Sequence, residues 1–301
     1  MITGFAQLMQ MVQQGKNKKI AVAAADELEI LQVIGKAEKM DLADFILIGD
    51  KGRMETLMGQ HGIQLKAEMV HEPDHKMAAE KAVLMVRNGE ADTLMKGMLH
   101  SALFLKAVLN KETGLNVGKY MTQISIIEKD DGGLLMITDC AITVNPDLKG
   151  KIQVLENAVD LAHRLGIAMP RVAILAPLET VNPEIQDTVD AAIISKMGQR
   201  GQIKGCVIDG PLAFDNAVSQ EAADAKGIIS EVAGKADIIV VPNLSVGNAI
   251  TKTITYIAGK PVIAATVGAA VPIVFTSRTE SDEGKLLTIA LAAYASGKAK
   301  L

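Results

Sequence analysis

Short apolar runs alternate with longer amphipathic segments along this chain, and this alternation constrains the fold more than any other feature. Runs of strand length occur at Ile20–Ala25, Phe45–Gly49, Ala67–Val70, Thr93–Lys96, Gln123–Glu128, Leu134–Thr138, Val172–Ala176, Gly205–Asp209, Ile238–Pro242, Val262–Thr266 and Ile273–Thr276. Helix-like spacing of apolar residues follows Asp26 and recurs at Asp74–Asn88, Ser101–Asn110, Lys151–Leu165, Pro183–Met197, Ser219–Ile229, Gly247–Ala258 and Glu283–Ser296. Such an alternation predicts an α/β protein with mostly parallel sheets covered by helices on both faces.

One pair of strands breaks the alternation. Gln123–Glu128 and Leu134–Thr138 are separated only by Lys129–Gly133, a segment with two Asp and two Gly that is typical of a β-hairpin. A hairpin midway through an α/β chain indicates that one sheet ends and another begins. We therefore expect a domain boundary near residue 122.

Composition excludes several classes of protein. The chain has 301 residues, enough for two domains, and a net charge of −4, which does not suit a general nucleic-acid binder. Its two cysteines, Cys140 and Cys206, exclude a disulfide-rich secreted scaffold. The longest uncharged stretch, Pro261–Ser277, contains Gly268 and Pro272 and fits two strands and a turn better than a membrane span. We expect a cytoplasmic protein that binds neither nucleic acid nor membrane.

Two familiar kinds of site, a zinc-protease site and a nucleotide-binding site, are not supported by the sequence. His71-Glu72-Pro73-Asp74-His75 matches the zinc-protease pattern, which requires both histidines on one helix face. Pro73 favours a helix that begins there, so His71 is expected to precede the helix. Because no G-x-G-x-x-G or complete phosphate loop occurs either, we expect no metal site and no typical nucleotide site.

Arg278 is the most informative candidate residue. Ligands of open α/β sheets bind beyond the carboxyl ends of strands, and Thr276-Ser277-Arg278-Thr279 follows the last predicted strand. The chain has only six arginines against 25 lysines, and Arg278 alone lies among hydroxyl side chains. A guanidinium flanked by such donors suits a phosphate-like anion. The alternative is an ion pair with Glu280 or Asp282.

Other predicted strand ends carry polar residues as well. Asp209 precedes a Gly-Pro turn and Asp215 precedes a helix, so these carboxylates supply either a base or helix and turn caps. Asn243–Asn248 is a strand-to-helix turn in which Gly247 permits close approach of a ligand to the backbone. Lys96-Gly97 and Asp139-Cys140 complete the set.

Taken together, these segments resemble the phosphate acetyl/butyryltransferase family over nearly the whole chain. The resemblance is carried by Asp209–Ala217 (D-G-P-L-A-F-D-N-A), Val241–Asn248 and Thr276-Ser277-Arg278, with Met95–Gly97 and Thr138–Ala141 as further landmarks. The D-G-P-L-A-F-D-N segment favours the butyryl branch of the family.

The resemblance implies reversible exchange of a short acyl group, most simply butyryl, between coenzyme A and inorganic phosphate, by direct transfer. The substrates would be acyl-CoA and phosphate, with no cofactor and no metal. The implied fold is two doubly wound, three-layer α/β domains of the isocitrate/isopropylmalate-dehydrogenase type with an interdomain cleft. Domain I would comprise residues 1–122 and 270–301, and domain II residues 123–269. Relatives are dimeric or larger, so we expect a homodimer or higher homo-oligomer.

Site roles also follow from the resemblance. Arg278 would neutralise the phosphate, Ser277 would donate a hydrogen bond to the developing oxyanion or leaving group, and Asp282 would be the candidate base. Binding of substrate would involve Lys96, Gly97, Lys106, Asp139, Cys140, Asp209, Asn243, Gly247, Asn248 and Thr276.

Departures from the family pattern leave some roles open. The position of the basic aspartate in the acetyl-transferring relatives falls between Asp282 and Lys285, and Lys106 replaces a frequent arginine. Cys140 is expected to be a small buried residue, since the family is thought to use direct transfer. Because Ala249–Lys252 also departs from the pattern, a degenerate CoA- or acyl-phosphate-binding protein is an alternative. A metal- and NAD-dependent decarboxylating dehydrogenase is a further alternative. Such enzymes bind the substrate acid with several clustered arginines, whereas the six arginines of this chain are scattered.

Overall fold

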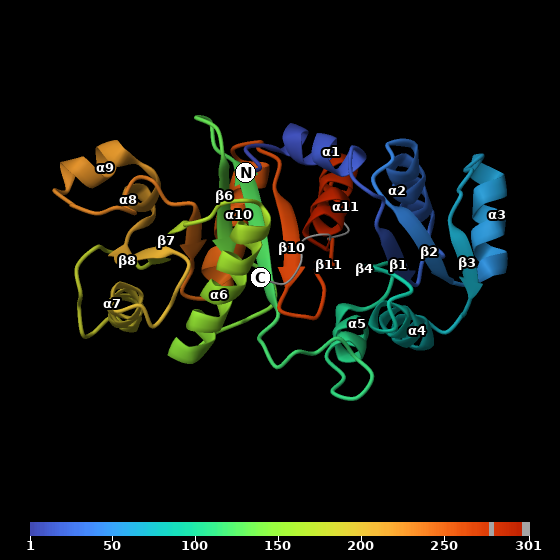
Figure 1. Ribbon diagram of the computed structural model, residues 1–301, viewed down its shortest axis with the longest axis horizontal. Coiled ribbons are helices and arrows are strands. Elements are labelled where there is room, and N and C mark those ends of the chain that lie inside the picture. Colours follow the sequence, from blue (N-terminus) through green and yellow to red (C-terminus); the bar gives the residue numbers. More distant parts are fainter. Residues whose placement is uncertain (277–279, 297–301) are drawn as a thin grey trace. The chain divides into compact units, whose positions relative to one another are not determined.

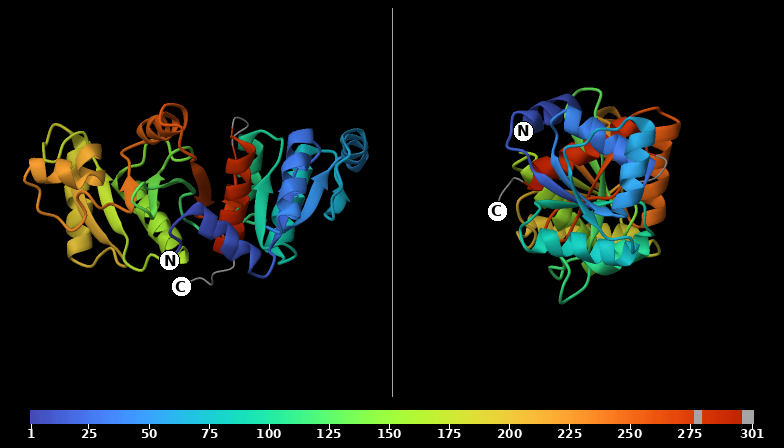
Figure 2. Two further views of the ribbon diagram at one scale, coloured as in Figure 1. Left: turned by 90° about the horizontal axis from the view of Figure 1, so that it is seen from above. Right: turned by 90° about the vertical axis from the view of Figure 1, so that its right-hand side faces the viewer.

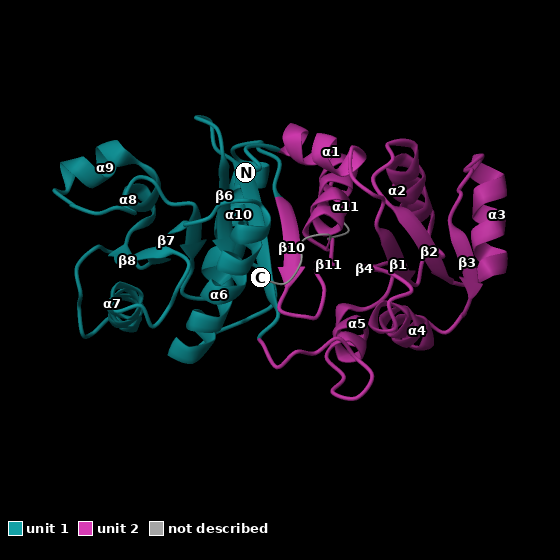
Figure 3. Cartoon of the chain, in the orientation of Figure 1, with its two compact units in different colours: residues 1–4, 120–262 teal, residues 5–119, 263–301 magenta. Residues whose placement is uncertain are grey.

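The structure is a computed structural model that describes residues 1–276 and 280–296. It divides into two compact units, with residues 1–4 and 120–262 in unit 1 and residues 5–119 and 263–301 in unit 2 (Figure 3). Both units are α/β, as the alternation predicts (Figure 1). No described helix has the length and apolar character needed to span a bilayer.

Unit 2 is built on a mostly parallel sheet with strand order β3-β2-β1-β4-β11-β10. Its strands are β1 (Lys19–Ala23), β2 (Asp44–Gly49), β3 (Glu68–His71), β4 (Thr93–Lys96), β10 (Ile263–Val267) and β11 (Ile273–Val274). Strands β3, β2, β1, β4 and β11 are parallel, and only β10 runs antiparallel to its neighbour β11. The apolar residues of β1, β2, β4 and β11 are buried, as expected for strands covered on both faces, whereas Met69 and Val70 of the edge strand β3 are only partly buried.

Six described helices surround this sheet. They are α1 (Phe5–Gln13), α2 (Leu28–Lys39), α3 (Lys51–His61), α4 (His75–Arg87), α5 (Ser101–Val108) and α11 (Asp282–Ser296). Within unit 2, α4 and α5 pack together on one face of the strands, whereas α1, α2 and α11 lie on the other (Figures 1 and 2). Helix α11, near the end of the chain, therefore covers the sheet that also contains the first four strands.

Unit 1 contains the predicted hairpin followed by parallel strands, in the order β5-β6-β9-β7-β8. The strands are β5 (Thr122–Glu128), β6 (Leu134–Thr138), β7 (Arg171–Leu175), β8 (Val207–Leu212) and β9 (Ile238–Val240), and the helices are α6 (Leu148–Arg164), α7 (Gln186–Gln199), α8 (Phe214–Val218), α9 (Gln220–Ala225) and α10 (Leu244–Tyr256). Ser125 pairs with Ile137 and Glu128 with Leu134 in the antiparallel hairpin, which confirms that prediction.

The limits expected for the two domains need correction at two places. Residues 1–4 belong to unit 1, where the Ile2 N–H donates to the Leu165 carbonyl at 2.8 Å. The chain returns to unit 2 at Ile263 and not at residue 270, because β10 pairs with β11 through Thr266 and Ile273 and stays in the same sheet.

The histidine pair of the zinc-like motif is divided between two elements. His71 ends β3, and α4 begins only at His75, capped by the Asp74 carboxylate, which accepts from the Met77 N–H at 2.9 Å. The two imidazoles therefore do not share a helix face, which agrees with rejection of the motif.

Candidate active site

The carboxyl edge of the unit 2 sheet has a topological switch point between β1 and β4. From β1 the chain adds β2 and then β3 on one side, and β4 and β11 lie on the other. The order of the strands thus reverses between β1 and β4, and open α/β sheets bind ligands at such a point of their carboxyl edge. Lys96 is the last residue of β4 and Gly97 follows it, so both predicted residues lie at this switch point.

Gly97 allows an unusually close approach of two backbone segments. Its N–H donates to the Ala23 carbonyl at 2.8 Å, and the Met98 N–H donates to the Ala24 carbonyl at 2.9 Å. A Cβ at Gly97 would lie 2.1 Å from the Ala24 oxygen, a separation that no side chain tolerates. Only glycine fits here, and it leaves the end of β4 without a side chain beside Lys96.

Lys96 is partly buried and is held by an aromatic ring. Its Nζ lies 3.3 Å from the Gly97 carbonyl oxygen and 5.6 Å from the centroid of the Phe275 ring. Phe275 in turn packs against Phe104 of α5, with ring centroids 5.9 Å apart. The ammonium group is thus fixed at the strand ends by a cation–π contact.

The strand next to β4 leads toward the predicted anion-binding residues. Thr276 is partly buried just after β11, and Ser277, Arg278 and Thr279 lie outside the described residues.

Other arginines of the chain already have partners that fix their side chains. Arg53 contacts Glu27 at 2.7 Å, Arg171 contacts Asp237 at 3.0 Å, and Arg87 donates to the carbonyls of Glu112 and Gly114. These three guanidinium groups therefore have structural roles.

Asp282, the candidate base, is the first residue of α11 and pairs with Lys36 of α2 at 2.5 Å. The hydrogen bond from Lys36 holds the pKa of Asp282 below its ordinary value, with help from the charge of Lys285. Lys285 itself is buried on the first turn of α11, 3.8 Å from Glu29 of α2. These pairs join the start of α11 to α2, and they make Asp282 a weaker proton acceptor than a free carboxylate.

Lys106 lines a cavity of about 220 Å³ between α4 and α5. Lys76 and Glu80 of α4 also line it and lie 3.8 Å apart as an ion pair, beside apolar residues of both helices such as Val83 and Ala107. The ammonium group of Lys106 and the apolar wall are therefore the features of this cavity that suit an anionic ligand with an apolar part.

Asp139 of unit 1 organises the loop that follows β6. Its carboxylate is 2% exposed and accepts three backbone N–H groups, from Ala141 at 2.8 Å, Ile142 at 3.0 Å and Thr143 at 3.0 Å. Burial raises the pKa of Asp139 above its ordinary value, although these three bonds act in the opposite direction. Because its oxygens are occupied, Asp139 shapes the loop and does not itself offer a free oxygen to a substrate.

Cys140 is buried, as expected. Its thiol is 3% exposed and contacts the Ile137 carbonyl with Sγ at 3.2 Å. Burial raises the pKa of Cys140 to about 12. The side chain is therefore a neutral thiol at physiological pH, which does not suit a covalent nucleophile.

The start of α10 contacts the loop that follows β6. Asn243 caps α10 by accepting from the Val246 N–H at 3.1 Å, and the Asn248 side chain donates to the Cys140 carbonyl at 3.4 Å. A Cβ at Gly247 would lie 2.4 Å from the Asp139 carbonyl oxygen. Asp139, Cys140, Asn243, Gly247 and Asn248 thus form one cluster, which we call the β6–α10 cluster.

Asp209 does not join the β6–α10 cluster, and the strand end predicted there is wrong. β8 continues through Gly210 and Pro211 to Leu212, so Asp209 lies within the strand, opposite Ala173 of β7. Strands β9 and β7 separate β6 from β8, which puts about 14 Å between them. Asp209 instead lines a cavity of about 630 Å³ with residues of α7 and of 230–232.

Asp215, the second carboxylate of that segment, is paired on the surface. It lies in the first turn of α8, accepts from the Asn216 N–H at 2.8 Å and contacts Lys226 at 3.2 Å. These bonds hold the pKa of Asp215 below its ordinary value, so the carboxylate acts as a cap and ion-pair partner.

The sequence reasoning missed two residues at the switch point. Phe275 was treated only as part of a strand, although its place one residue before Thr276 indicates proximity to Lys96. The other is Asp26, which precedes α2 and its N-cap residue Glu27. Asp26 is 4% exposed, its Oδ2 lies 3.5 Å from His75 Nε2, and its Oδ1 has no hydrogen-bond partner.

Comparisons with known proteins agree with this arrangement. Residues 64–293 match the family model described as "Phosphate acetyl/butaryl transferase". The chain is 44% identical over 299 residues to phosphate butyryltransferase of Clostridium acetobutylicum, covering 99% of each chain.

Solved structures show the same fold. A branched-chain phosphotransacylase from Enterococcus faecalis V583 superposes with a TM-score of 0.83 at 30% identity, covering 93% of this chain and 99% of that one. 4-Hydroxythreonine-4-phosphate dehydrogenase from Klebsiella pneumoniae shares the fold alone, with a TM-score of 0.59 at 12% identity, over 93% of this chain and all of that one. The two α/β units are therefore of the dehydrogenase-like type, and the chain belongs to the phosphate acetyl/butyryltransferase family.

Proposed function

We propose that this protein exchanges a short acyl group, most simply butyryl, between coenzyme A and inorganic phosphate. The observation that carries the proposal is the Lys96-Gly97 pair at the switch point, in a chain whose family transfers acyl groups to phosphate. A partly buried ammonium at the carboxyl ends of the strands suits a phosphate that must meet a second substrate there.

The reaction balances without any redox change. A phosphate oxygen attacks the thioester carbonyl carbon, the carbon–sulfur bond breaks, and the thiolate of CoA leaves and takes up a proton. In reverse, the thiol loses that proton as it attacks the acyl phosphate. The chemistry needs charge neutralisation, a donor for the oxyanion and a proton acceptor, so we propose no cofactor and no metal.

Residues of unit 2 take the polar roles in this proposal. Arg278 neutralises the phosphate, Ser277 donates to the developing oxyanion, and Lys96, Gly97 and Thr276 line the phosphate site. We assign Asp282 to anchoring α11 through Lys36, which leaves the identity of the base open.

The cavity lined by Lys106 supports binding of an anionic part of CoA there, with Lys76 already paired to Glu80. Residues of the β6–α10 cluster shape the unit 1 contribution to substrate binding. Asp209 is the least supported of the predicted contacts, because it lies in a separate cavity.

The test is release of thiol from butyryl-CoA in the presence of phosphate. Arg278→Ala should lower kcat/KM by at least about 100-fold, the scale for loss of one donor to a developing anion. Arg200→Ala, at the exposed end of α7, is the matched control and should leave the rate unchanged. Robust turnover by Arg278→Ala would contradict the assignment, and CoA binding without any transfer by the wild type would favour the binding-protein alternative.

We also propose that the protein acts in the cytoplasm as a homodimer or larger assembly. Large exposed apolar side chains support an interface between copies, among them Ile229, Ile257 and Val144. Light scattering coupled to size exclusion would test this, and a monomer at micromolar concentration would contradict it.

A further inference from the structure

Phe275 and Lys96 are neighbours on adjacent parallel strands. Val274 of β11 pairs with Met95 of β4, so the next residue on each strand, Phe275 and Lys96, continues the same register. The Lys96 ammonium lies over the Phe275 ring at 5.6 Å from its centroid. A cation and an apolar ring thus lie side by side at the switch point.

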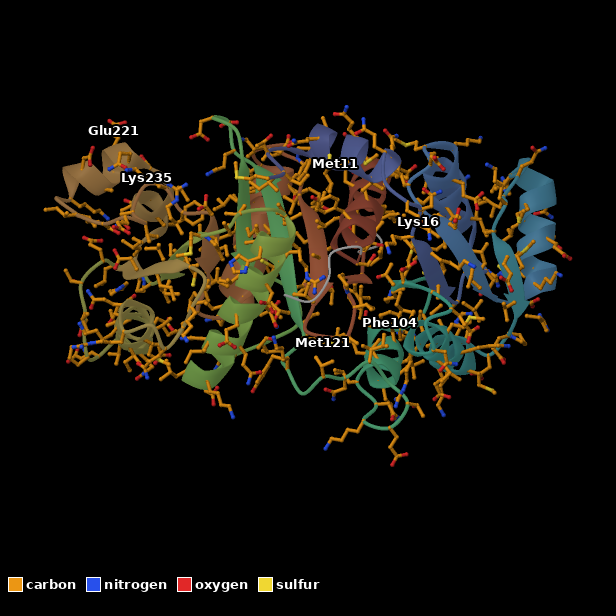
Figure 4. The ribbon with its side chains drawn as sticks, in the orientation of Figure 1. Met11, Lys16, Phe104, Met121, Glu221 and Lys235 are labelled. Carbon is orange, nitrogen blue, oxygen red and sulfur yellow. The ribbon has the colours of Figure 1, made fainter. Side chains whose placement is uncertain are left out.

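The ring is fixed from the protein interior. Phe104 of α5, which is labelled in Figure 4, is fully buried. Its ring packs against that of Phe275 with the ring planes tilted by 50°. Phe275 itself is only partly buried, unlike Phe104. The chain has only five Phe, three Tyr and no Trp, so an aromatic pair at this place is not a common feature of its core.

An acyl phosphate presents the complementary pair of groups. Its anionic phosphate is separated from its alkyl chain by a single carbonyl, so a phosphate held by Lys96 leaves the chain next to an apolar surface. We propose that Phe275 is that surface and limits the length of the acyl chain, which makes it a specificity-determining residue. This inference rests on the proposed function, and it adds a determinant of specificity: the ring against which the acyl chain ends.

The physical basis is the contact of methylene groups with a rigid wall. One methylene in an apolar pocket changes kcat/KM by about 10- to 200-fold. A ring backed by Phe104 cannot move away from a longer chain without disturbing buried packing, so chains longer than butyryl are rejected. A smaller side chain at position 275 would make room for them.

The experiment compares kcat/KM for acetyl-, butyryl- and hexanoyl-CoA in the wild type, Phe275→Leu and Phe275→Ala. The ratio of hexanoyl to butyryl should rise by about tenfold or more in Phe275→Ala and less in Phe275→Leu. The ratio is the informative quantity, because altered positioning of Lys96 affects all three substrates equally. Phe214→Leu is the matched control, since Phe214 lies on α8 of unit 1, and it should keep the wild-type ratio.

Two failures can be told apart. If the wild type transfers no acyl group to phosphate, the proposed function is wrong. If the wild type is active and the ratio changes by less than about twofold in a folded Phe275→Leu variant, only the role of Phe275 is wrong. Phe275→Leu decides the matter should Phe275→Ala fail to fold, as judged by circular dichroism.

Discussion

The Lys36 ammonium on α2 lies 2.5 Å from the carboxylate of Asp282, the first residue of α11. Both side chains are about half exposed, at 52% and 53%, so the pair contributes little to stability. Its importance is that the carboxylate of Asp282, the candidate base, is already paired with a cation.

Asp282→Asn should therefore lower kcat/KM by less than about tenfold, whereas loss of a general base costs about 10²- to 10⁴-fold. Steady-state rates with butyryl-CoA and phosphate check this. The charge-swapped double variant Lys36→Asp/Asp282→Lys separates the two roles: it should recover the activity lost in either single variant if the pair anchors α11. If Asp282 were the general base, swapping the two charges would not restore activity. Persistent inactivity of the double variant would therefore support Asp282 as the base.

Gly97→Ala should destabilise the protein by more than about 3 kcal/mol, because the new Cβ would overlap the backbone oxygens of Ala23 and Ala24. Gly59→Ala is the control. Gly59 lies in α3 with nothing within 4 Å of its Cβ position, so this change should stabilise by about 0.5–1 kcal/mol. Urea unfolding of both variants measures the difference, and equal midpoints would contradict the close approach described above.

Asp139 should make stability depend on pH in the direction opposite to most carboxylates. Its pKa is raised in the folded protein above the ordinary 3.8 by burial, so the folded state binds its proton more tightly than the unfolded chain does. The free energy of unfolding therefore falls as pH rises from 3.8 through the folded pKa.

Comparison of unfolding curves between wild type and Asp139→Asn isolates this contribution, because the variant cannot titrate there. The difference in free energy of unfolding between the two proteins should change as pH rises through the folded pKa of Asp139. It should be constant at higher pH. Asp139→Ala should cost about 1–3 kcal/mol, since three backbone amides, of which that of Thr143 is buried, lose their acceptor. A pH-independent difference between wild type and Asp139→Asn would show that the raised pKa is wrong.

Cys140→Ala should retain activity within about threefold and lose about 1 kcal/mol of stability from a small cavity. The reason is that a thiol with a pKa of about 12 is not ionised at neutral pH and forms no acyl-enzyme. Mass spectrometry after incubation with butyryl-CoA should find no acylated Cys140. A stoichiometric acyl adduct at that residue would overturn direct transfer.

The alternation of apolar runs sufficed to predict the strands of both units, because buried parallel strands leave a continuous apolar signal. It did not reveal α3, of which only Met54 is buried, so the helix has no apolar stripe to detect. Its end signals were present, with Asp50 as the N-cap and Gly62 in a left-handed conformation at the C-cap.

Candidate residues were harder to predict than elements. Lys96 and Gly97 lie where predicted, because a strand end can be seen in the sequence. Asp209 was misplaced because Gly210-Pro211 was interpreted as a turn, whereas β8 is the last strand of the unit 1 order, and edge strands tolerate proline. The hydrogen bonds that the Asp139 carboxylate accepts from backbone amides depend on the path of the loop after β6. The spacing of residues in the sequence does not predict that path.

The position of β11 between β4 and β10 has a consequence for synthesis on the ribosome. Translation completes unit 1 at residue 262, before β10 and β11 emerge. Until then the nascent chain carries β4 with one edge unpaired, and its Leu94 and Met95, fully buried in the finished sheet, lack the cover of α11. An open apolar strand edge is a site for unwanted pairing, so the interval before β11 emerges is when mispairing of β4 is expected.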